Sequence, residues 1–457
     1  MSRTKASFWK GLLGALLFSA LSACNQTSPG DQPPPGGNCP TGGEGTLRVG
    51  FSGLPPGVPA RARLEGPDLS REIIGEGQTL TVPAGPYTLR AERTADTHPI
   101  VRQAFVPTAL QASTCVRRGQ EATLSLGYRL IPSSGRLWMG ESLSHRVYGF
   151  PRGSLSTPGT LSPDPNANTQ AYMALTFDQE GNLWVARQYR SEPHLYRYPA
   201  ASLAGGNPIP DRRINIGGLD QNTRPNDLAF DEQGHLWIAV YNADTIFRLD
   251  RDQLAGAGSG PTTLVPRVLL SVDGPSTLAF DREGNLWVGR GEAGTLQEPA
   301  LLRYDRGRLD RSIPATEGPD RTLIALHWNR NNRLGNSDLA FDREGNLWVM
   351  SYLSGTLYRV ERERLSGSGT QTLEPSVRIF LGNARLSGMA FDESGGLWIA
   401  YGAGQFARLS PEQLRQSSQN PLTPAQVFQV PREGNIDRYP HSLAFFPAPA
   451  GLPLYAR

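Results

Sequence analysis

The chain has 457 residues and a formal net charge of +3, and it is rich in glycine (51) and proline (38). This composition disfavours long helices and suits many short strands joined by turns. The first 23 residues contain Arg3, Lys5 and Lys10 but no acidic residue, so the rest of the chain is formally neutral. We therefore expect no nucleic-acid partner, because binding a polyanion needs a basic surface.

The N-terminal segment has the pattern of an export signal. A basic start is followed by an apolar run over residues 11–21 and then by Leu21-Ser22-Ala23-Cys24. The run is too short for a membrane-spanning helix. Its end resembles the lipobox of bacterial lipoproteins, which implies that residues 1–23 are removed and Cys24 is lipidated. We expect an exported protein, lipid-anchored to a bacterial membrane at the cell surface or facing the periplasm; the alternative is an ordinary signal peptide.

The next two segments differ sharply in pattern. Residues 24–45 are mostly proline, glycine and polar residues, which predicts a tether. Residues 46–130 contain short alternating stretches such as TLRVGF and ARARLEG between turns, which predicts a small antiparallel β-sandwich. The stretch LTVPAGPYTLRAE (80–92) resembles the transthyretin-like and PEGA-like modules of bacterial envelope proteins. Cys39 and Cys115 either form a disulfide, as export would favour, or remain two separate thiols.

The remaining segment, residues 131–450, repeats one phrase. LAFDREGNLWV occurs at residues 278–288 and again at 339–349, with looser copies at 175–185, 228–238 and 389–399. Successive tryptophans of the repeat are 46 to 61 residues apart: Trp138, Trp184, Trp237, Trp287, Trp348 and Trp398. This period matches a propeller blade of four strands with its loops.

The phrase itself predicts a tight hairpin. Leu-Ala-Phe-Asp ends the innermost strand of a blade, and Gly-Asn-Leu-Trp-Val begins the next strand. Asp initiates the turn and Gly supplies the positive φ. We interpret the repeated aspartates as turn formers rather than metal ligands: Asp178, Asp231, Asp281, Asp342 and Asp392. The Trp and Phe rings are expected to fill the wedge between neighbouring blades.

The two ends of the repeat array predict how it closes. GRLWMG (135–140) lacks the strand that should precede it, and HSLAFF (441–446) lacks the strand that should follow it. These halves can pair only if the array forms a ring, which also removes its exposed edges. The sequence therefore predicts an all-β chain with a six-bladed propeller, one blade of which is split between its termini.

The blades resemble the NHL and gluconolactonase (senescence-marker-like) propellers, with TRPNDLAFDEQGHLWIA (223–239) as the closest copy. The resemblance implies a divalent metal in the channel, held by an Asn before an innermost strand and by carboxylates from other blades. Asn226 matches that Asn, but the equivalent positions are Met173, Ser276, Ser337, Ser387 and His441, none of them acidic. Asn226, Asp227 and Asp338 are therefore weak candidates for calcium or zinc, and we expect no bound cofactor.

A polar funnel is predicted at one end of the channel. The loops that lead into the innermost strands and those that leave the Trp strands must meet there. The candidate ligand-binding residues are Glu141, Arg187, Asn226, Arg290, Asn336, Tyr401 and His441. Such side chains suit sugars and carboxylates, although long exposed loops are polar in any case.

Three functions fit this pattern. The first is a monomeric, non-catalytic module that binds an envelope glycan, peptide or protein. The second is a metal-dependent lactonase or related hydrolase, with Asn226, Asp227, Asn336 and Asp338 near the ion and His441 as general base. The third is a lyase, because the G-x-L-W blades also resemble those of streptogramin lyases; His441 would be the base, and Arg187 or Arg290 would hold an acidic substrate. The missing carboxylates favour the first.

Overall fold

The computed structural model describes most of the chain from Cys39 onward. The described residues are 39–95, 103–109, 111–131, 136–141, 146–163, 166–167, 174–187, 194–204, 208–219, 223, 225–290, 300–325, 336–351, 354–382, 385–392, 394–402, 404–431 and 440–446. The expected export signal, Cys24 and most of the expected tether lie outside them. Among the described residues, no helix has both the length and the apolar character to cross a membrane.

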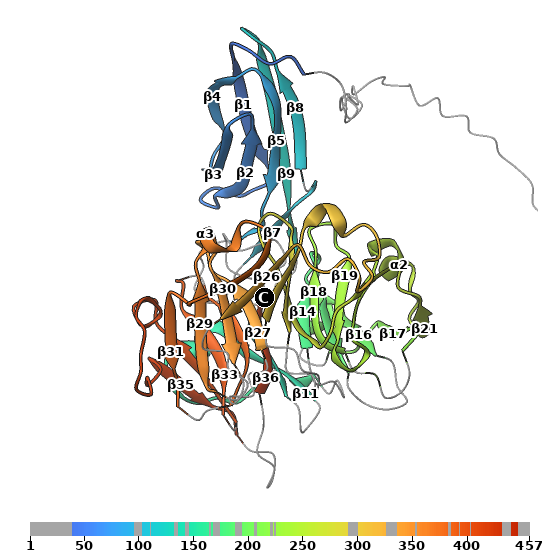
Figure 1. The fold of residues 1–457 in the computed structure, drawn as a ribbon, viewed down its shortest axis with the longest axis vertical. Coiled ribbons are helices and arrows are strands. Elements are labelled where there is room, and N and C mark those ends of the chain that lie inside the picture. The colour runs from blue at the N-terminus through green and yellow to red at the C-terminus, as the bar shows by residue number, and fades with distance from the viewer. Residues whose placement is uncertain are drawn as a thin grey trace, which may run out of the picture. The chain divides into compact units, whose positions relative to one another are not determined.

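The first nine strands form two sheets of their own (Figure 1). One sheet contains, in spatial order, β4 (Gln78–Pro83), β1 (Glu44–Ser52), β9 (Glu121–Ile131), β7 (Ala104–Pro107) and β6 (Thr94–Ala95). The other contains β3 (Leu69–Gly75), β2 (Ala60–Gly66), β5 (Gly85–Ala91) and β8 (Gln111–Val116). The pairing is antiparallel except between β1 and β9. Alternate residues such as Leu47, Leu64 and Leu89 build a shared core, and a disulfide joins Cys39 to Cys115 in β8.

The remaining strands form six small sheets, which are the predicted blades. We number them so that blade 1 is the split one. Blades 1, 3 and 5 have four strands each, from the channel outward: β36 (Pro440–Phe446), β10 (Arg136–Glu141), β11 (Arg146–Pro151), β13 (Asn166–Ala167); β18 (Pro225–Phe230), β19 (Leu236–Val240), β20 (Thr245–Leu249), β22 (Val268–Ser271); β27 (Asn336–Phe341), β28 (Leu347–Ser351), β29 (Thr356–Val360), β31 (Val377–Phe380).

Blades 2, 4 and 6 have five strands each. They are β14 (Ala174–Phe177), β15 (Leu183–Ala186), β16 (Leu195–Tyr198), β17 (Arg212–Ile216), β21 (Pro261–Leu264); β23 (Pro275–Phe280), β24 (Leu286–Arg290), β25 (Ala300–Tyr304), β26 (Arg321–Ala325), β30 (Gly369–Leu373); β32 (Leu386–Phe391), β33 (Leu397–Tyr401), β34 (Gln405–Leu409), β35 (Gln426–Gln429), β12 (Gly159–Thr160). Each fifth strand comes from the following blade, where it lies between the third and fourth strands. It pairs in parallel with its host. The propeller is thus a ring of three blade pairs, 2–3, 4–5 and 6–1, which the sequence analysis did not foresee.

A short helix follows the third strand of every blade. These helices are η1 (Arg152–Ser156), α1 (Ala200–Ala204), α2 (Arg251–Gly256), η3 (Arg306–Arg308), α3 (Arg362–Leu365) and η4 (Gln413–Arg415), and one further turn, η2 (Tyr241–Ala243), follows β19. At or beside the end of each blade helix one leucine is buried: Leu155, Leu203, Leu254, Leu309, Leu365 and Leu414. This leucine ties the helix to its blade.

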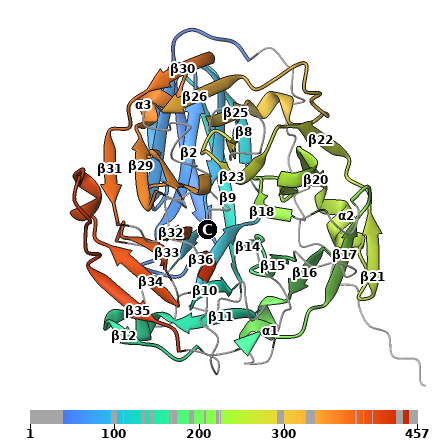
Figure 2. The ribbon, with the colours of Figure 1, turned by 60° about the horizontal axis from the view of Figure 1, so that its bottom comes forward.

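Ring closure by the split blade is confirmed. β36 pairs antiparallel with β10, with Leu443 opposite Met139 and Phe445 opposite Leu137. Figure 2 shows β36, in red, beside the teal β10 although the two strands lie at opposite ends of the repeat array. Each innermost strand contacts the next around the ring, and β36 contacts β14. Closure therefore leaves no innermost strand without two neighbouring blades.

The repeated phrase folds as the predicted hairpin. In blade 4, Asp281 Oδ1 accepts the backbone N–H of Asn285 at 2.8 Å, and Gly284 has a φ of 84°. The aspartate also has a role that the sequence analysis missed, because its Oδ2 accepts the indole N–H of Trp287 at 3.0 Å. The same indole bond occurs in the other four hairpins, from Trp184, Trp237, Trp348 and Trp398. These aspartates are therefore structural, as expected.

Four of the five turn aspartates differ from the fifth in charge environment. Burial raises the pKa of Asp178, Asp231, Asp281 and Asp342 above the ordinary carboxyl value. Burial also acts on Asp392, but the Arg408 guanidinium, 2.6 Å from its Oδ2, lowers its pKa overall. Gly396 permits this contact, because a Cβ there would lie 2.2 Å from Arg408 Nη2.

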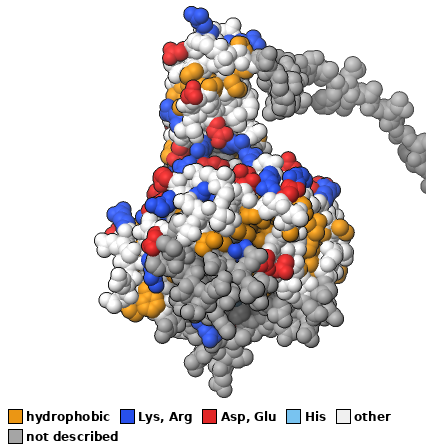
Figure 3. All heavy atoms as spheres, viewed as in Figure 1, with side chains coloured by type: hydrophobic (Ala, Val, Ile, Leu, Met, Phe, Trp, Pro, Cys, Tyr) orange, Lys and Arg blue, Asp and Glu red, His pale blue; other side chains and the backbone are white. Residues whose placement is uncertain are grey.

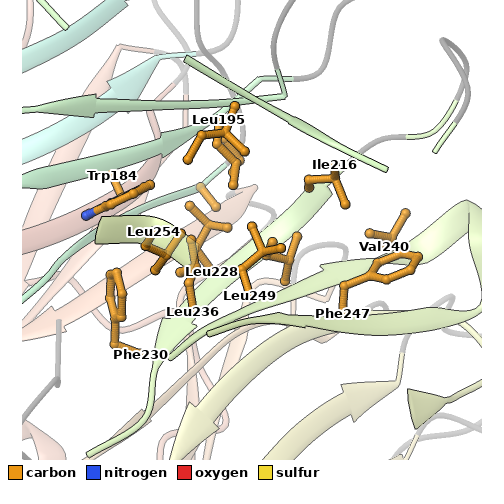
Figure 4. Close-up of a cluster of buried hydrophobic side chains, with 14 of the residues drawn as sticks. Trp184, Leu195, Ile216, Leu228, Phe230, Leu236, Val240, Phe247, Leu249 and Leu254 are labelled. Atoms are coloured by element: carbon orange, nitrogen blue, oxygen red, sulfur yellow. The ribbon is translucent and has the colours of Figure 1, made fainter. Parts of the chain in front are cut away.

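Aromatic rings fill the wedge between blades, as predicted. The Trp of each blade meets the Phe of the next at ring-centroid distances between 6.0 and 6.5 Å, in the pairs Trp138–Phe177, Trp184–Phe230, Trp237–Phe280, Trp287–Phe341, Trp348–Phe391 and Trp398–Phe445. Figure 4 shows one such interface, where Trp184 and Phe230 border a cluster of leucines that includes Leu228, Leu236 and Leu254. The core is thus distributed among the blade interfaces.

Ion pairs and apolar contacts connect the nine-strand sandwich with the hairpin turns of the propeller. Arg63 lies 2.9 Å from Glu283, and Arg90 lies 3.3 Å from Glu232. Val106 of β7 belongs to the same buried cluster as Trp138. Glu283 and Glu232 both follow turn aspartates, so these contacts involve the hairpin end of the blades.

Candidate functional site at the bulged end of the channel

The innermost strands share a β-bulge at their first residues. In five of the six hairpins one innermost-strand segment carries an extra residue against its partner strand. The extra residues are Asn226, Ser276, Ser337, Ser387 with Gly388, and His441, which are the positions that the sequence analysis grouped as a ring. Bulges re-aim side chains and occur often beside binding sites. The ring therefore exists as a structural feature at the end of the channel opposite the hairpin turns.

Three bulge side chains hydrogen-bond to the backbone of their own or the adjoining blade. Ser276 Oγ donates to the carbonyl of Gly289 at 2.7 Å, and Ser387 Oγ donates to that of Pro440 at 2.6 Å. Asn226 Oδ1 accepts the backbone N–H of Tyr241 at 3.4 Å. The amide oxygen proposed as a metal ligand thus already has a backbone donor.

A buried polar belt lies one residue after the bulges. Asp227 Oδ2 accepts the hydroxyl of Thr277 and the backbone N–H of Leu278 in the next blade, both at 2.8 Å. Asp338 Oδ2 accepts the N–H of Met389 at 2.7 Å, again in the next blade. Asp227 and Asp338 are 3% and 1% exposed. Each carboxylate therefore joins its own innermost strand to the neighbouring one.

This belt differs from what a metal site would need. The Oδ1 atoms of Asp227 and Asp338 also accept backbone N–H groups, those of Leu228 and Leu339. Cation binding would compete with these bonds for both oxygens of each carboxylate. Over the described residues, no group of three His, Cys, Asp or Glu side chains is arranged to hold a metal ion.

Two hydroxyls at this end are buried without a hydrogen-bond partner among the described residues. Ser351 is the last residue of β28, opposite Asn336, and Ser442 follows His441 in β36. The two serines are 1% and 4% exposed. An unsatisfied buried hydroxyl carries a free-energy penalty of about 1–3 kcal/mol, which a ligand or an ordered water would relieve. Neither serine was a candidate in the sequence analysis.

The structure places the predicted funnel residues at one end of the innermost hairpins. Glu141 is opposite Pro440, Arg290 opposite Pro275, and Tyr401 opposite Leu386. Their exposure differs more than the sequence suggested, because Glu141 is fully buried while Arg290 and Tyr401 are half-buried.

The other funnel candidates lie at the same strand ends. Arg187 follows β15 and is 9% exposed, and its Nη1 donates to the hydroxyl of Tyr196 at 3.2 Å. His441 is half-buried, and Asn336 is placed in β27 with a side chain outside the described residues. Beside Arg187 lies His194, whose pKa is lowered by burial and whose Nδ1 accepts the N–H of Ile216. A neutral imidazole at this point was not predicted, since only the fold brings it there.

Charge on the described surface is mixed. Figure 3 shows basic and acidic side chains side by side on the face in view, without a broad field of one sign. This distribution agrees with the neutral composition of the chain after residue 23 and gives no basic track for a polyanion. Recognition at the channel would therefore depend on local contacts.

No protein-family model and no curated protein matches the chain. Among solved structures, a streptogramin B lyase is similar with 13% identity and a TM-score of 0.39, over 68% of this chain and 87% of that chain. A catalytically inactive virginiamycin B lyase from Staphylococcus aureus, with quinupristin, is similar with 11% identity and a TM-score of 0.36, over 59% of this chain and 72% of that one. Similarity at this level carries no argument about activity, so function is argued from the site itself.

Proposed function

We propose that the propeller is a non-catalytic binding module of the cell envelope, which presents the bulged end of its channel to a ligand. The observation that carries this proposal is the division of polar groups at the channel. The carboxylates of Asp227 and Asp338 accept backbone N–H groups of the blades. The hydroxyls of Ser351 and Ser442 are buried without partners among the described residues. The first pair maintains the ring, and the second pair gains from a ligand.

The ligand class proposed is a polar or acidic group of an envelope glycan, peptide or protein. Arg187 and Arg290 supply guanidinium groups suited to a carboxylate. Tyr401 supplies a ring face that can stack on a sugar, and His441 adds a group that can donate or accept. All four lie at or beside the bulged strand ends. A monomer is sufficient, because a single ring carries every proposed contact.

Membrane attachment completes the proposal. A lipid on Cys24 and the tether of residues 24–45 would hold the propeller at a bacterial membrane, with no contact to nucleic acid. Replacing Cys24 by Ser is expected to abolish lipidation, so that the variant no longer partitions into detergent. Unchanged partitioning would refute the lipid anchor without affecting the binding proposal.

A pair of matched sugars tests the binding site. Glucuronate and glucose share a ring but differ in the carboxylate, so isothermal titration should show tighter binding of glucuronate. Arg290→Gln and His441→Ala should each weaken it by about tenfold, the usual effect of losing one charge-assisted hydrogen bond. Arg378→Gln, on the exposed face of β31, is the matched control and should leave binding unchanged. Equal binding of the two sugars by all four proteins would contradict the proposed site.

Metal content and turnover test the hydrolase alternative. With Asn226, Asp227 and Asp338 already hydrogen-bonded to backbone N–H groups, we expect no stoichiometric metal after purification and no hydrolysis of gluconolactone. One calcium or zinc per chain that is lost in Asn226→Ala, together with lactone hydrolysis, would replace the binding proposal by an enzymatic one.

A further inference from the structure

A second site is carried by the other end of the blades, and it begins with an arginine that two neighbouring interfaces contain. The residue that follows the third strand and its cap is Arg306 in blade 4 and Arg362 in blade 5. Arg306 forms an ion pair with Glu232 in the turn of blade 3. Arg362 lies 3.2 Å from Glu283 in the turn of blade 4. In both cases the guanidinium spans the groove between adjacent blades.

The groove between blades 5 and 6 lacks this arginine. The equivalent residue of blade 6 is Pro411, which stands at the first position of the turn that leads into η4. Glu344, in the turn of blade 5, corresponds to Glu283 and forms no ion pair among the residues that the structure describes. The proline fits its position well, because the preceding Ser410 and Gln413 cap the turn reciprocally at 3.0 and 3.3 Å.

The contact across this groove is also longer than its counterparts. The strand-three arginine donates to the leucine carbonyl of the next blade at 2.7 Å from Arg248 and 2.8 Å from Arg303, but at 3.4 Å from Arg359. A cavity of about 400 Å³ lies at this interface, and Glu344, Pro411, Asp392, Trp348 and Phe391 line it with others. This volume is within the range of small-ligand sites.

The cavity lining defines the chemistry of an occupant. Trp348 and Phe391 meet edge-to-face at 6.3 Å and form an aromatic wall, and Glu344 supplies a carboxylate that the equivalent grooves use for a guanidinium. Asp342 and Asp392 are engaged with Trp348 and Arg408, so Glu344 is the acid available for an ion pair. Arg415, also in the lining, balances the overall charge and leaves recognition to short-range contacts.

We propose that the groove between blades 5 and 6 binds the guanidinium group of an arginine, which takes the place that Arg306 and Arg362 occupy in the two preceding grooves. The carboxylate of Glu344 would pair with the cation, and the Trp348–Phe391 wall would pack on its apolar stem. The source of the guanidinium is either an arginine side chain of a peptide or a free small molecule. This site is separate from the bulged end of the channel and does not depend on the function proposed there.

Three probes distinguish the sources. Isothermal titration of the full chain would use the tripeptide Gly-Arg-Gly, its neutral counterpart Gly-citrulline-Gly, and methylguanidinium. We expect Gly-Arg-Gly to bind and the citrulline peptide not to bind. Tighter binding of Gly-Arg-Gly than of methylguanidinium identifies a peptide ligand, and equal binding identifies a small cation. Absence of binding by both cations would refute the site.

An internal competitor gives the sharper test. Pro411→Arg restores the residue of blades 4 and 5, so its side chain should fill the groove, pair with Glu344 and lower binding of Gly-Arg-Gly by at least about tenfold. Pro411→Ala, which removes the ring without adding a cation, should bind as the wild type does. Glu344→Gln should weaken binding to a similar extent as Pro411→Arg.

Folding of the competitor variant is verified independently. Arginine occupies this position in three blades, as Arg251, Arg306 and Arg362, so Pro411→Arg should unfold at or above the wild-type temperature. Undiminished binding of Gly-Arg-Gly by a folded Pro411→Arg variant would overturn the proposal. The glucuronate titration at the bulged end should be unchanged in this variant, so a failure of one site is separable from a failure of the other.

Discussion

Blades with five strands and blades with four strands use the same hairpin but differ at one outer position. The residue opposite the strand-three arginine is Arg212, Arg321 or Gln426 in the five-stranded blades 2, 4 and 6. It is Val268 or Val377 in the four-stranded blades 3 and 5. One position on the fourth strand thus separates the two kinds of blade.

The polar residue at this position fastens the next blade. Arg212 donates to the carbonyls of Ala255 and Ala257 around the end of α2, and Arg321 donates to that of Arg364 in α3 at 2.8 Å. Gln426 donates to the carbonyl of Ser156 in η1 at 3.3 Å. These bonds satisfy carbonyls at helix C-termini, which have no partner within the helix. The valines make no such bond and are buried instead.

The comparison shows how a nearly uniform repeat produces an alternating assembly. Within a pair, the second blade lends a strand to the first, and the first blade clasps the helix of the second. Between pairs, the described outer strands meet only through single bridges, Leu270 with Ile313 and Ile379 with Ser418. We therefore expect the pairs to be the locally stable units and the ring to be the globally stable one.

Removing the closing strand should have the largest effect. Deleting residues 441–457 takes away most of β36, whose Leu443 and Phe445 are buried, and opens both blade 1 and the 6–1 pair. Each lost side chain contributes about 1.5–3 kcal/mol, so we expect a loss of several kcal/mol and aggregation through exposed edges. Thermal unfolding and light scattering measure this. Deleting only residues 448–457 is the control, and equal melting temperatures for the two truncations would show that pairs suffice without the ring.

Removing a turn aspartate should have the next largest effect, equal in the two kinds of blade. Asp281→Ala in blade 4 and Asp342→Ala in blade 5 each leave a buried indole N–H and an asparagine amide without their acceptor. We expect each to lower the free energy of unfolding by about 3 kcal/mol, given about 1–3 kcal/mol per unsatisfied group. Denaturant titration gives the values. A clear difference between the two variants would mean that the hairpins are not equivalent parts.

Removing the clasp should affect only the five-stranded blades. Arg321→Ala deletes bonds to Arg364 and Gln371 across the 4–5 pair, and the expected loss is about 1.5 kcal/mol. Arg378→Ala, on the exposed face of β31 in blade 5, should change the free energy of unfolding by less than about 0.5 kcal/mol. Hydrogen exchange should show faster opening of β30 in Arg321→Ala alone. Equal exchange in the two variants would remove the clasp from the explanation.

The smallest effect concerns pH. The folded-state pKa of Asp392 is lowered by Arg408 despite its burial, so its stabilising contribution is present above the unfolded-state pKa and is lost as pH falls through the folded-state value. Arg408→Met should cost about 1–2 kcal/mol at pH 7, and the deficit relative to the wild type should shrink below about pH 4.

The other turn aspartates give the opposite sign. The pKa of Asp342 is raised by burial, so its protonation favours the folded state and its ionisation opposes it as pH rises. Thermal unfolding of the wild type and of Arg408→Met at pH 7 and pH 3 separates the two cases. A deficit that is the same at both pH values would show that the Asp392–Arg408 contact is not an ion pair of consequence.

The sequence by itself determined the repeat, its hairpin and its closure. Asp281, Gly284 and Trp287 act within a few residues of one another, so local turn chemistry specifies them and the repetition makes the pattern visible. The half-phrases around Trp138 and Leu443 predicted the split blade for the same reason, since each half lacks a strand that a complete copy contains. The ring of bulge positions was also readable as a column in the repeat, from Asn226 to His441.

Only the tertiary structure decided which of these groups are used up by the fold. Whether Asp227 faces a ligand or the N–H of Leu278 depends on how closely the next blade approaches, and no local pattern records that distance. The exchanged strands, the clasp of Arg321 and the groove beside Pro411 likewise arise between blades that are dozens of residues apart in sequence. Local chemistry therefore set the shape of each blade, and packing between blades set which polar groups remain for binding.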